Sequence, residues 1–388
     1  MGTNSYAMAS MASMASMASM ASMASMASSG GSQKSLTTEA VPAAASGSLI
    51  GARDGIVGHY EPPAVVPDHL PFNSMDHMAF METGVRISAI QSELFSEIKF
   101  DIGEEEFSVS DRATNGVIAS IKRPDIGEFQ KQLDYIAAYA DLRLDRAPEI
   151  YAQVGEIMSV IGQTISLHPQ RHKWTIEYLF VAVGAVIEIE KRFKAVMNVR
   201  RPFELSSQMQ PMITTPAHSA FPSGHATEAF AMSEVLAAIV DHMDGAQQLT
   251  GRVSRRGQMQ MQAARVGVNR TVAGVHYPID TFAGASLGTA LGQYMVRRSR
   301  PAGAEADMRG LRFESPWDPA VGGDTPDFGL ADFNTQAEGP DGGQAGAYVR
   351  PQTAFAVPNS PSMAWLWNKV AEEWAIPAAP EAPAGAGV

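Results

Sequence analysis

Four consecutive residues, Pro222-Ser223-Gly224-His225, combine the parts of an anion-binding site. Ser223 is a favourable helix N-cap, and the apolar spacing that follows predicts a helix from Gly224. Unpaired backbone N–H groups at a helix N-terminus attract an anion, and a glycine there allows close approach to the backbone. His225 lies in the first turn, where its ring can donate or accept a proton. The tetrapeptide therefore predicts an oxyanion site with a histidine beside it.

Two further patterns supply the groups that such a site lacks. Six residues separate Lys194 from Arg201, and five residues separate Arg270 from His276, with Asp280 four positions later. Lysine and arginine side chains give an oxyanion positive charge and directional donors. His276 would then approach the central atom, while Asp280 accepts a hydrogen bond from the other ring nitrogen.

Each of these residues also has a purely structural interpretation. Lys194 and Arg201 could belong to a solvated basic face, and Asp280 could be an ordinary helix N-terminal carboxylate. His276 alone would more often be structural than catalytic. The joint occurrence of these types at fixed spacings favours chemistry, with His225 as acid or base on the side opposite His276.

The three patterns together resemble the signature of the superfamily of type 2 phosphatidic acid phosphatases and vanadium-dependent haloperoxidases, over roughly residues 194–280. The resemblance implies that His276 is the nucleophile of a phosphatase, or the vanadium ligand of a haloperoxidase. It implies that His225 protonates the leaving group in the first case and assists peroxide binding in the second. One position departs from the pattern, since Asn269 stands where a serine usually precedes the arginine. The residues that the resemblance assigns to oxyanion binding are Lys194, Arg201, Ser223, Gly224 and Arg270.

The residues that flank the motifs bear on the reaction. Thr215-Pro216-Ala217-His218 resembles a haloperoxidase segment, and His218 matches a histidine of bromide-oxidising members, which implies a halide or substrate pocket. Against this, Lys191 stands where haloperoxidases usually carry an aromatic residue. The connection of 21 residues between Arg201 and Ser223 is more like that of compact phosphatases.

The resemblance leads us to expect a vanadate-dependent haloperoxidase that oxidises bromide or iodide with hydrogen peroxide. Two alternatives stay open. One is a soluble acid phosphatase that hydrolyses phosphate monoesters through a phosphohistidine and needs no cofactor. The other is a non-catalytic scaffold that retains the fold.

Apolar residues recur at three- and four-residue spacing along much of the chain, and no strand pattern of similar strength accompanies them. We therefore expect an all-α fold, a helical bundle of the haloperoxidase and acid phosphatase type. Gly284, Gly288 and Gly292 would share one helix face and allow a close helix–helix crossing. The longest helices are expected near residues 150–167, 174–199, 224–241 and 278–296.

Composition shifts divide the chain into three parts. Residues 1–48 hold a Met-Ala-Ser repeat and are predicted to be disordered. Residues 49–300 are expected to form a helical catalytic domain with an extended N-terminal arm. Residues 301–388 form a Gly/Pro-rich extension, in which a short helix over Met363–Ile376 should dock on the core.

Charge and composition exclude several classes of protein. The net charge of −12 argues against a nucleic-acid binder, and the absence of cysteine excludes disulfides and thiol catalysis. The longest apolar run, Tyr178–Ile187, has about half of the ~20 residues that a membrane span needs. We expect a soluble, cytoplasmic enzyme without a signal peptide. Its partners would be small molecules, either peroxide and halide or a phosphate ester, and a homo-oligomer is conceivable.

Overall fold

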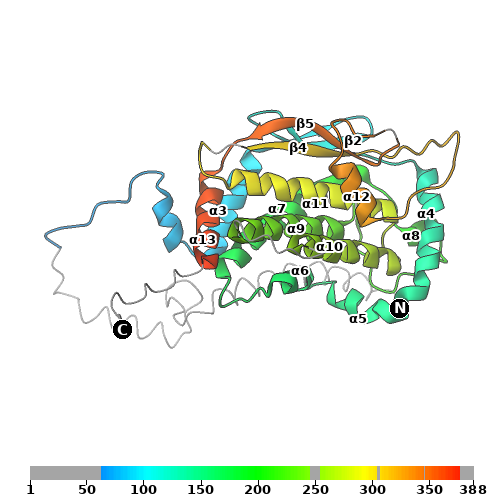
Figure 1. Cartoon of the computed structure of the whole chain (residues 1–388), viewed down its shortest axis with the longest axis horizontal. Coiled ribbons are helices and arrows are strands. Elements are labelled where there is room, and N and C mark those ends of the chain that lie inside the picture. The colour runs from blue at the N-terminus through cyan, green and yellow to red at the C-terminus, as the bar shows by residue number, and fades with distance from the viewer. Residues whose placement is uncertain (1–62, 245–253, 304–305, 345, 376–388) are drawn as a thin grey trace, which may run out of the picture.

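The computed structural model describes residues 63–244, 254–303, 306–344 and 346–375. The Met-Ala-Ser repeat and the first part of the predicted arm lie outside the described residues. Figure 1 shows a sheet lying across a layer of long helices.

The prediction of an all-α fold is wrong, because five strands form one mixed sheet in the order β1-β2-β3-β4-β5. Neighbouring strands are antiparallel except β3 and β4, which run parallel with Ala119 opposite Leu311. The strands are β1 (Ile98–Ile102), β2 (Glu106–Asp111), β3 (Val117–Lys122), β4 (Ala306–Phe313) and β5 (Val349–Val357).

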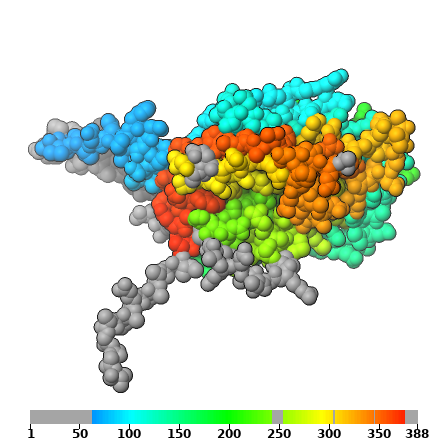
Figure 2. Space-filling model, turned by 45° about the horizontal axis from the view of Figure 1, so that its top comes forward, coloured from blue at the N-terminus to red at the C-terminus, as the bar shows by residue number. Residues whose placement is uncertain are grey.

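The sheet went unpredicted because its strands are short and its central pairing joins segments far apart in sequence. In β2 only Phe107 and Val109 carry the apolar alternation that places one face against the helices. Pro351 lies within β5, which is tolerated because β5 is an edge strand. In Figure 2, β1–β3 (cyan) and β4–β5 (yellow to orange) form one continuous surface over the helices.

The three longest predicted helices after residue 170 are confirmed as α7, α9 and α11. The helix predicted over residues 150–167 is instead broken into α5 and α6, with Gln153–Glu156 between them. No described helix has both the length and the apolar character needed to cross a membrane. The helical elements are η1 (Met75–Phe80), α3 (Thr83–Ser96), α4 (Ile126–Tyr139), η2 (Ala140–Leu142), α5 (Arg143–Ala152), α6 (Ile157–Gly162), η3 (Gln163–Ile165), α7 (Lys173–Met197), α8 (Pro202–Leu205), α9 (Gly224–Asp244), α10 (Arg255–Val272), α11 (Pro278–Arg298), α12 (Leu330–Ala337) and α13 (Pro361–Trp374).

The helix predicted at the C-terminal end is α13, and it docks on α7 as expected. Met363, Leu366 and Val370 are buried. The Glu373 carboxylate accepts hydrogen bonds from the backbone N–H groups of Trp174 (2.8 Å) and Thr175 (3.0 Å). These N–H groups open α7, so α13 caps that helix from outside.

The core of the molecule is the crossing of α9 and α11, with α7 and α10 packed beside α9 and the sheet over α11. The predicted close approach along the glycine face is confirmed. A Cβ at Gly284 would lie 2.6 Å from the Ser223 carbonyl oxygen, and one at Gly288 only 2.2 Å from that of Thr227. The contact also brings Ser223 N–H within 3.0 Å of the Asp280 carbonyl oxygen. Small residues on α11 therefore fix the N-terminus of α9 beside the start of α11.

Gly288→Ala should destabilise the protein by about 3 kcal/mol, because the added methyl group meets backbone and the two helices must separate. The midpoint of urea unfolding measures this loss. Gly84→Ala is a matched control, since a Cβ there meets nothing within 4 Å. The control should be neutral or slightly stabilising. Equal effects of the two substitutions would contradict the close-packing account.

Candidate active site

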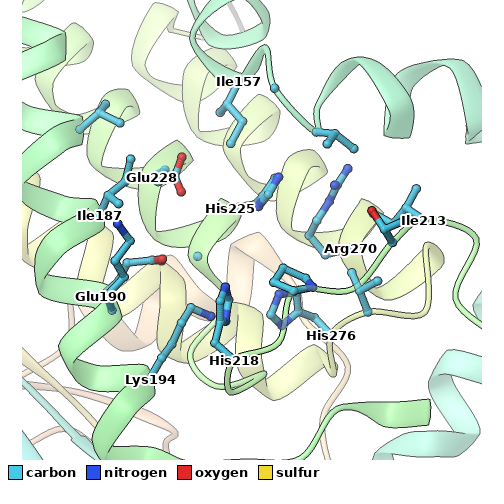
Figure 3. Close-up of a pocket in the computed structure, with 18 of the residues that line it drawn as sticks. Ile157, Ile187, Glu190, Lys194, Ile213, His218, His225, Glu228, Arg270 and His276 are labelled. Atoms are coloured by element: carbon cyan, nitrogen blue, oxygen red, sulfur yellow. The ribbon is translucent and has the colours of Figure 1, made fainter. Parts of the chain in front are cut away.

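A cavity of ≈ 200 Å³ opens at the N-terminus of α9, and most of the predicted site residues line it (Figure 3). Ser223 and Asp280 lie directly behind its wall and are fully buried. The predicted residues on the wall itself are Lys194, Arg201, His218, Gly224, His225, Arg270 and His276. The three sequence patterns thus meet at one place.

His276 is oriented by Asp280, which lies in the first turn of α11. The ring Nδ1 lies 2.8 Å from Asp280 Oδ2, and the same oxygen accepts the backbone N–H of Tyr277 at 3.1 Å. Since Nδ1 is taken, Nε2 is the ring nitrogen left for a ligand in the cavity. Burial lowers the pKa of His276 well below its ordinary value, and the positive charges of Arg201 and Lys194 act in the same direction. The ring is therefore neutral at pH 7, with a lone pair on Nε2.

The cations Lys194 and Arg201 are buried, only 3% and 2% exposed, which removes the interpretation of a solvated basic face. Lys194 Nζ donates to the Pro222 carbonyl oxygen at 2.5 Å. Arg201 donates to the carbonyl oxygens of Val275 (3.0 Å) and His218 (3.1 Å). Carbonyl partners hold these side chains in place without cancelling their charge. Burial lowers the pKa of Lys194 to about 8, and nearby Glu190 opposes this shift.

Arg270 is held at one end only. Its Nη2 donates to the Ile150 carbonyl oxygen and to Gln153 Oε1, each at 3.2 Å. Its Nε and Nη1, and Nε2 of His225, are buried without a hydrogen-bond partner in the described part of the chain. Unpaired buried donors are costly, at roughly 1–3 kcal/mol each. The two unpaired N–H groups of Arg270 fit a ligand that carries several acceptor oxygens, whereas Nε2 of a neutral His225 is an acceptor.

The departure at Asn269 is explained by a supporting contact that the sequence did not reveal. Asn269 donates to Gln153 Oε1 at 3.0 Å and accepts from Arg146 at 3.0 Å. Gln153 in turn accepts from Arg270, so Asn269 helps to orient that arginine. Gln153 lies in the break between α5 and α6, where no periodicity marks it.

His218 lies at the exposed rim of the cavity rather than in its interior. Its Nδ1 is 3.3 Å from Arg201 Nη2 and 3.1 Å from the Ser219 carbonyl oxygen. The predicted halide or substrate role stays a prediction.

Two acidic residues in the cavity, Glu190 and Glu228, were missed from the sequence. Glu190 precedes Lys194 by four positions on α7, and Glu228 follows Gly224 by four on α9, so helical spacing alone could have placed them on the cavity face. Burial raises the pKa of both carboxyl groups, that of Glu228 to about 8 with a further contribution from Glu190.

Glu228→Gln should make unfolding less dependent on pH. In the folded state Glu228 holds its proton up to about pH 8, whereas the unfolded residue ionises near its ordinary value of 4.5. The folded state thus binds more protons between these values, and this residue's contribution to stability falls as pH rises through that window. The upper limit is about 1.4 kcal/mol per pKa unit. Urea unfolding at pH 5 and pH 8 should show that the variant loses less stability than the wild type. An identical pH dependence would contradict the raised pKa.

Residues 174–302 match the family model described as the PAP2 superfamily, a span from α7 to just beyond α11 that holds all three motifs. The superfamily predicted from the motifs is confirmed for this span of the chain. No curated protein matches the chain. A similar solved structure is titled "Crystal structure of the first bacterial vanadium dependant iodoperoxidase", with a TM-score of 0.27 and 17% identity. The match covers 58% of this chain and 51% of that one, about half its length.

Proposed function

We propose that this chain, whose residues 174–302 belong to the PAP2 superfamily, is a phosphatase that hydrolyses phosphate monoesters at His276. The superfamily supports an enzyme of the phosphatase or haloperoxidase type. The choice of a phosphatase rests on the residues that line the cavity beyond the cations. These are Glu190 and Glu228, and farther along apolar side chains. A phosphate ester needs room for an organic group, whereas a halide needs none.

The reaction would begin with the phosphoryl oxygens held by the cationic end of the cavity and the Gly224 N–H. His276 Nε2 attacks phosphorus as the bond to the ester oxygen breaks, and His225 gives its proton to the departing oxygen. Water then attacks the phosphohistidine, His225 takes a proton from that water, and orthophosphate leaves. Burial and Arg270 lower the pKa of free His225, and a bound phosphate dianion would offset that positive charge.

Vanadate-dependent oxidation of bromide or iodide with hydrogen peroxide is the second candidate. The two unpaired N–H groups of Arg270 fit the oxygens of vanadate as well as those of phosphate. His276 Nε2 would ligate the vanadium, and the group would activate peroxide towards a halide. His218 at the rim, beside Arg201, is the observation that favours this reaction.

One pair of assays separates the candidates. Vanadate-free protein is tested for release of orthophosphate from p-nitrophenyl phosphate, and protein loaded with orthovanadate is tested for iodide and bromide oxidation with peroxide. Ester hydrolysis that orthovanadate inhibits supports the phosphatase. Halide oxidation without ester hydrolysis overturns it in favour of the haloperoxidase, and neither activity in folded protein favours the scaffold.

A further inference from the structure

The two helices that face the cavity each place a glutamate between the oxyanion end and an apolar end. On α7 the cavity residues run from Lys194 through Lys191 and Glu190 to Ile187 and Val183, at spacings of one to four. On α9 they run from Gly224 through Glu228 to Met232, at spacings of four. Such spacings keep each set on one helix face. The cavity therefore has cations at one end, two carboxyl groups in the middle with Lys191 also on the wall, and apolar side chains beyond.

The acidic zone is adjacent to the oxyanion site. A Cβ at Gly224 would lie 2.5 Å from Glu190 Oε2, so this carboxyl group rests on the backbone at the first turn of α9. Glu228 follows one helical turn later, about 5.4 Å along the axis. Figure 3 shows both acidic side chains on one side of His225, with Arg270 on the other.

One carboxyl oxygen of Glu190, Oε2, is buried without a hydrogen bond from any described residue. The residue is 6% exposed. The nearby Lys194 ammonium donates instead to the carbonyl oxygens of Ser219, Ala220 and Pro222. A buried carboxyl group without a partner must hold a proton or meet a cation. The cavity wall thus carries a buried carboxyl oxygen that no described residue satisfies.

We propose that Glu190 and Glu228 form a subsite for a cationic amine, so that the preferred substrates are phosphate monoesters of short amino alcohols. This inference rests on the proposed phosphatase function. An ammonium group two or three carbons from the ester oxygen lies about one helical turn from phosphorus, the separation between Gly224 and Glu228 on α9. Ion pairing of the ammonium with the carboxylates would replace their protons and satisfy the buried oxygens. An apolar substituent on the amine would extend towards Ile187 and Met232.

The test compares 2-aminoethyl phosphate with ethyl phosphate, which share the phosphate and the carbon chain and differ in the amine. The wild type should favour the amine ester in kcat/KM by at least about tenfold. Glu228→Gln and Glu190→Gln should each bring this ratio close to one. Glu188→Gln is the matched control, because Glu188 lies on the same helix but is 58% exposed and outside the cavity. It should keep the wild-type ratio. Equal hydrolysis of both esters by the wild type would overturn the subsite and leave the phosphatase standing.

A binding measurement separates failure of the subsite from failure of the phosphatase. Calorimetry on the His276→Ala variant, which cannot form a phosphohistidine, measures the affinity for each ester. Binding of the amine ester about tenfold tighter, lost on adding Glu228→Gln, supports the subsite even if no ester is hydrolysed. Equal affinity for the two esters overturns it, whatever the enzyme's activity.

Discussion

His276→Ala should reduce kcat/KM for phosphate-ester hydrolysis by about 10⁴-fold or more, the scale seen when a covalent nucleophile is removed. The structure gives a specific reason. Asp280 fixes Nδ1 of the ring, and burial with two nearby cations keeps the imidazole neutral, so that the lone pair on Nε2 is available to the cavity. An alanine leaves water as the only nucleophile. Steady-state hydrolysis of p-nitrophenyl phosphate measures the loss.

The same variant should also lose the covalent intermediate. Rapid acid-free quenching and intact-protein mass measurement should detect a phosphoryl adduct in the wild type and none in His276→Ala. His218→Ala is the control, because His218 lies at the exposed rim of the cavity. Its ring nitrogen contacts Arg201, so a small loss of activity is expected. Its loss should cost less than about tenfold. Activity of His276→Ala within tenfold of the wild type would disprove the assignment of the nucleophile.

The oxyanion end of the site could be predicted from the sequence because its residues lie close together in the chain. Gly224 and His225 stand at a helix N-terminus, and His276 and Asp280 are four positions apart at another, so spacing alone brings each pair together. The acidic zone could not be predicted in this way. Glu190 and Glu228 are ordinary helix residues in the sequence, and only the packing of α7 against α9 buries both in one cavity.

In the fold, too, elements set by nearby residues were predicted and elements set by distant pairings were missed. The helices α7, α9 and α11 were predicted because their apolar residues follow the helical period over several turns. The sheet was missed because the parallel pairing of β3 with β4 joins residues near 120 to residues near 311, and this pairing leaves no mark in the local sequence. Whether such segments form strands depends more on their tertiary contacts than on their own sequence.

The sheet and the site are connected through aromatic packing and the crossing of α9 and α11. Phe221, one residue before the motif, packs against Phe313 of β4 and Phe129 of α4, with ring centroids 5.5 and 6.0 Å apart. The glycine face of α11 then holds Ser223 against Asp280. The geometry of the oxyanion site thus depends on segments well outside the three motifs.

Asp280→Ala should lower kcat by about 10⁴-fold, with a smaller change in KM, because the residue orients the nucleophile rather than binding substrate. The carboxylate accepts from His276 Nδ1 (2.8 Å) and also stabilises the positive charge that develops on the ring as phosphohistidine forms. Asp280→Asn should be less severe. The backbone N–H of Tyr277 donates to the same oxygen at 3.1 Å, which favours an amide orientation that keeps an acceptor towards His276. The asparagine therefore retains the ring's orientation and loses only the charge.

The order of activity should be wild type, then Asn, then Ala, with the Asn variant about 10²-fold below the wild type. A purely structural role would give another pattern. Asp280 accepts hydrogen bonds at the start of α11, so both substitutions will lower stability, and urea unfolding must be measured beside kcat. If the loss of activity in both variants only follows the loss of folded protein, Asp280 supports the helix and not the nucleophile. If kcat falls in fully folded protein and asparagine restores part of it, the His276–Asp280 pair acts as the structure indicates.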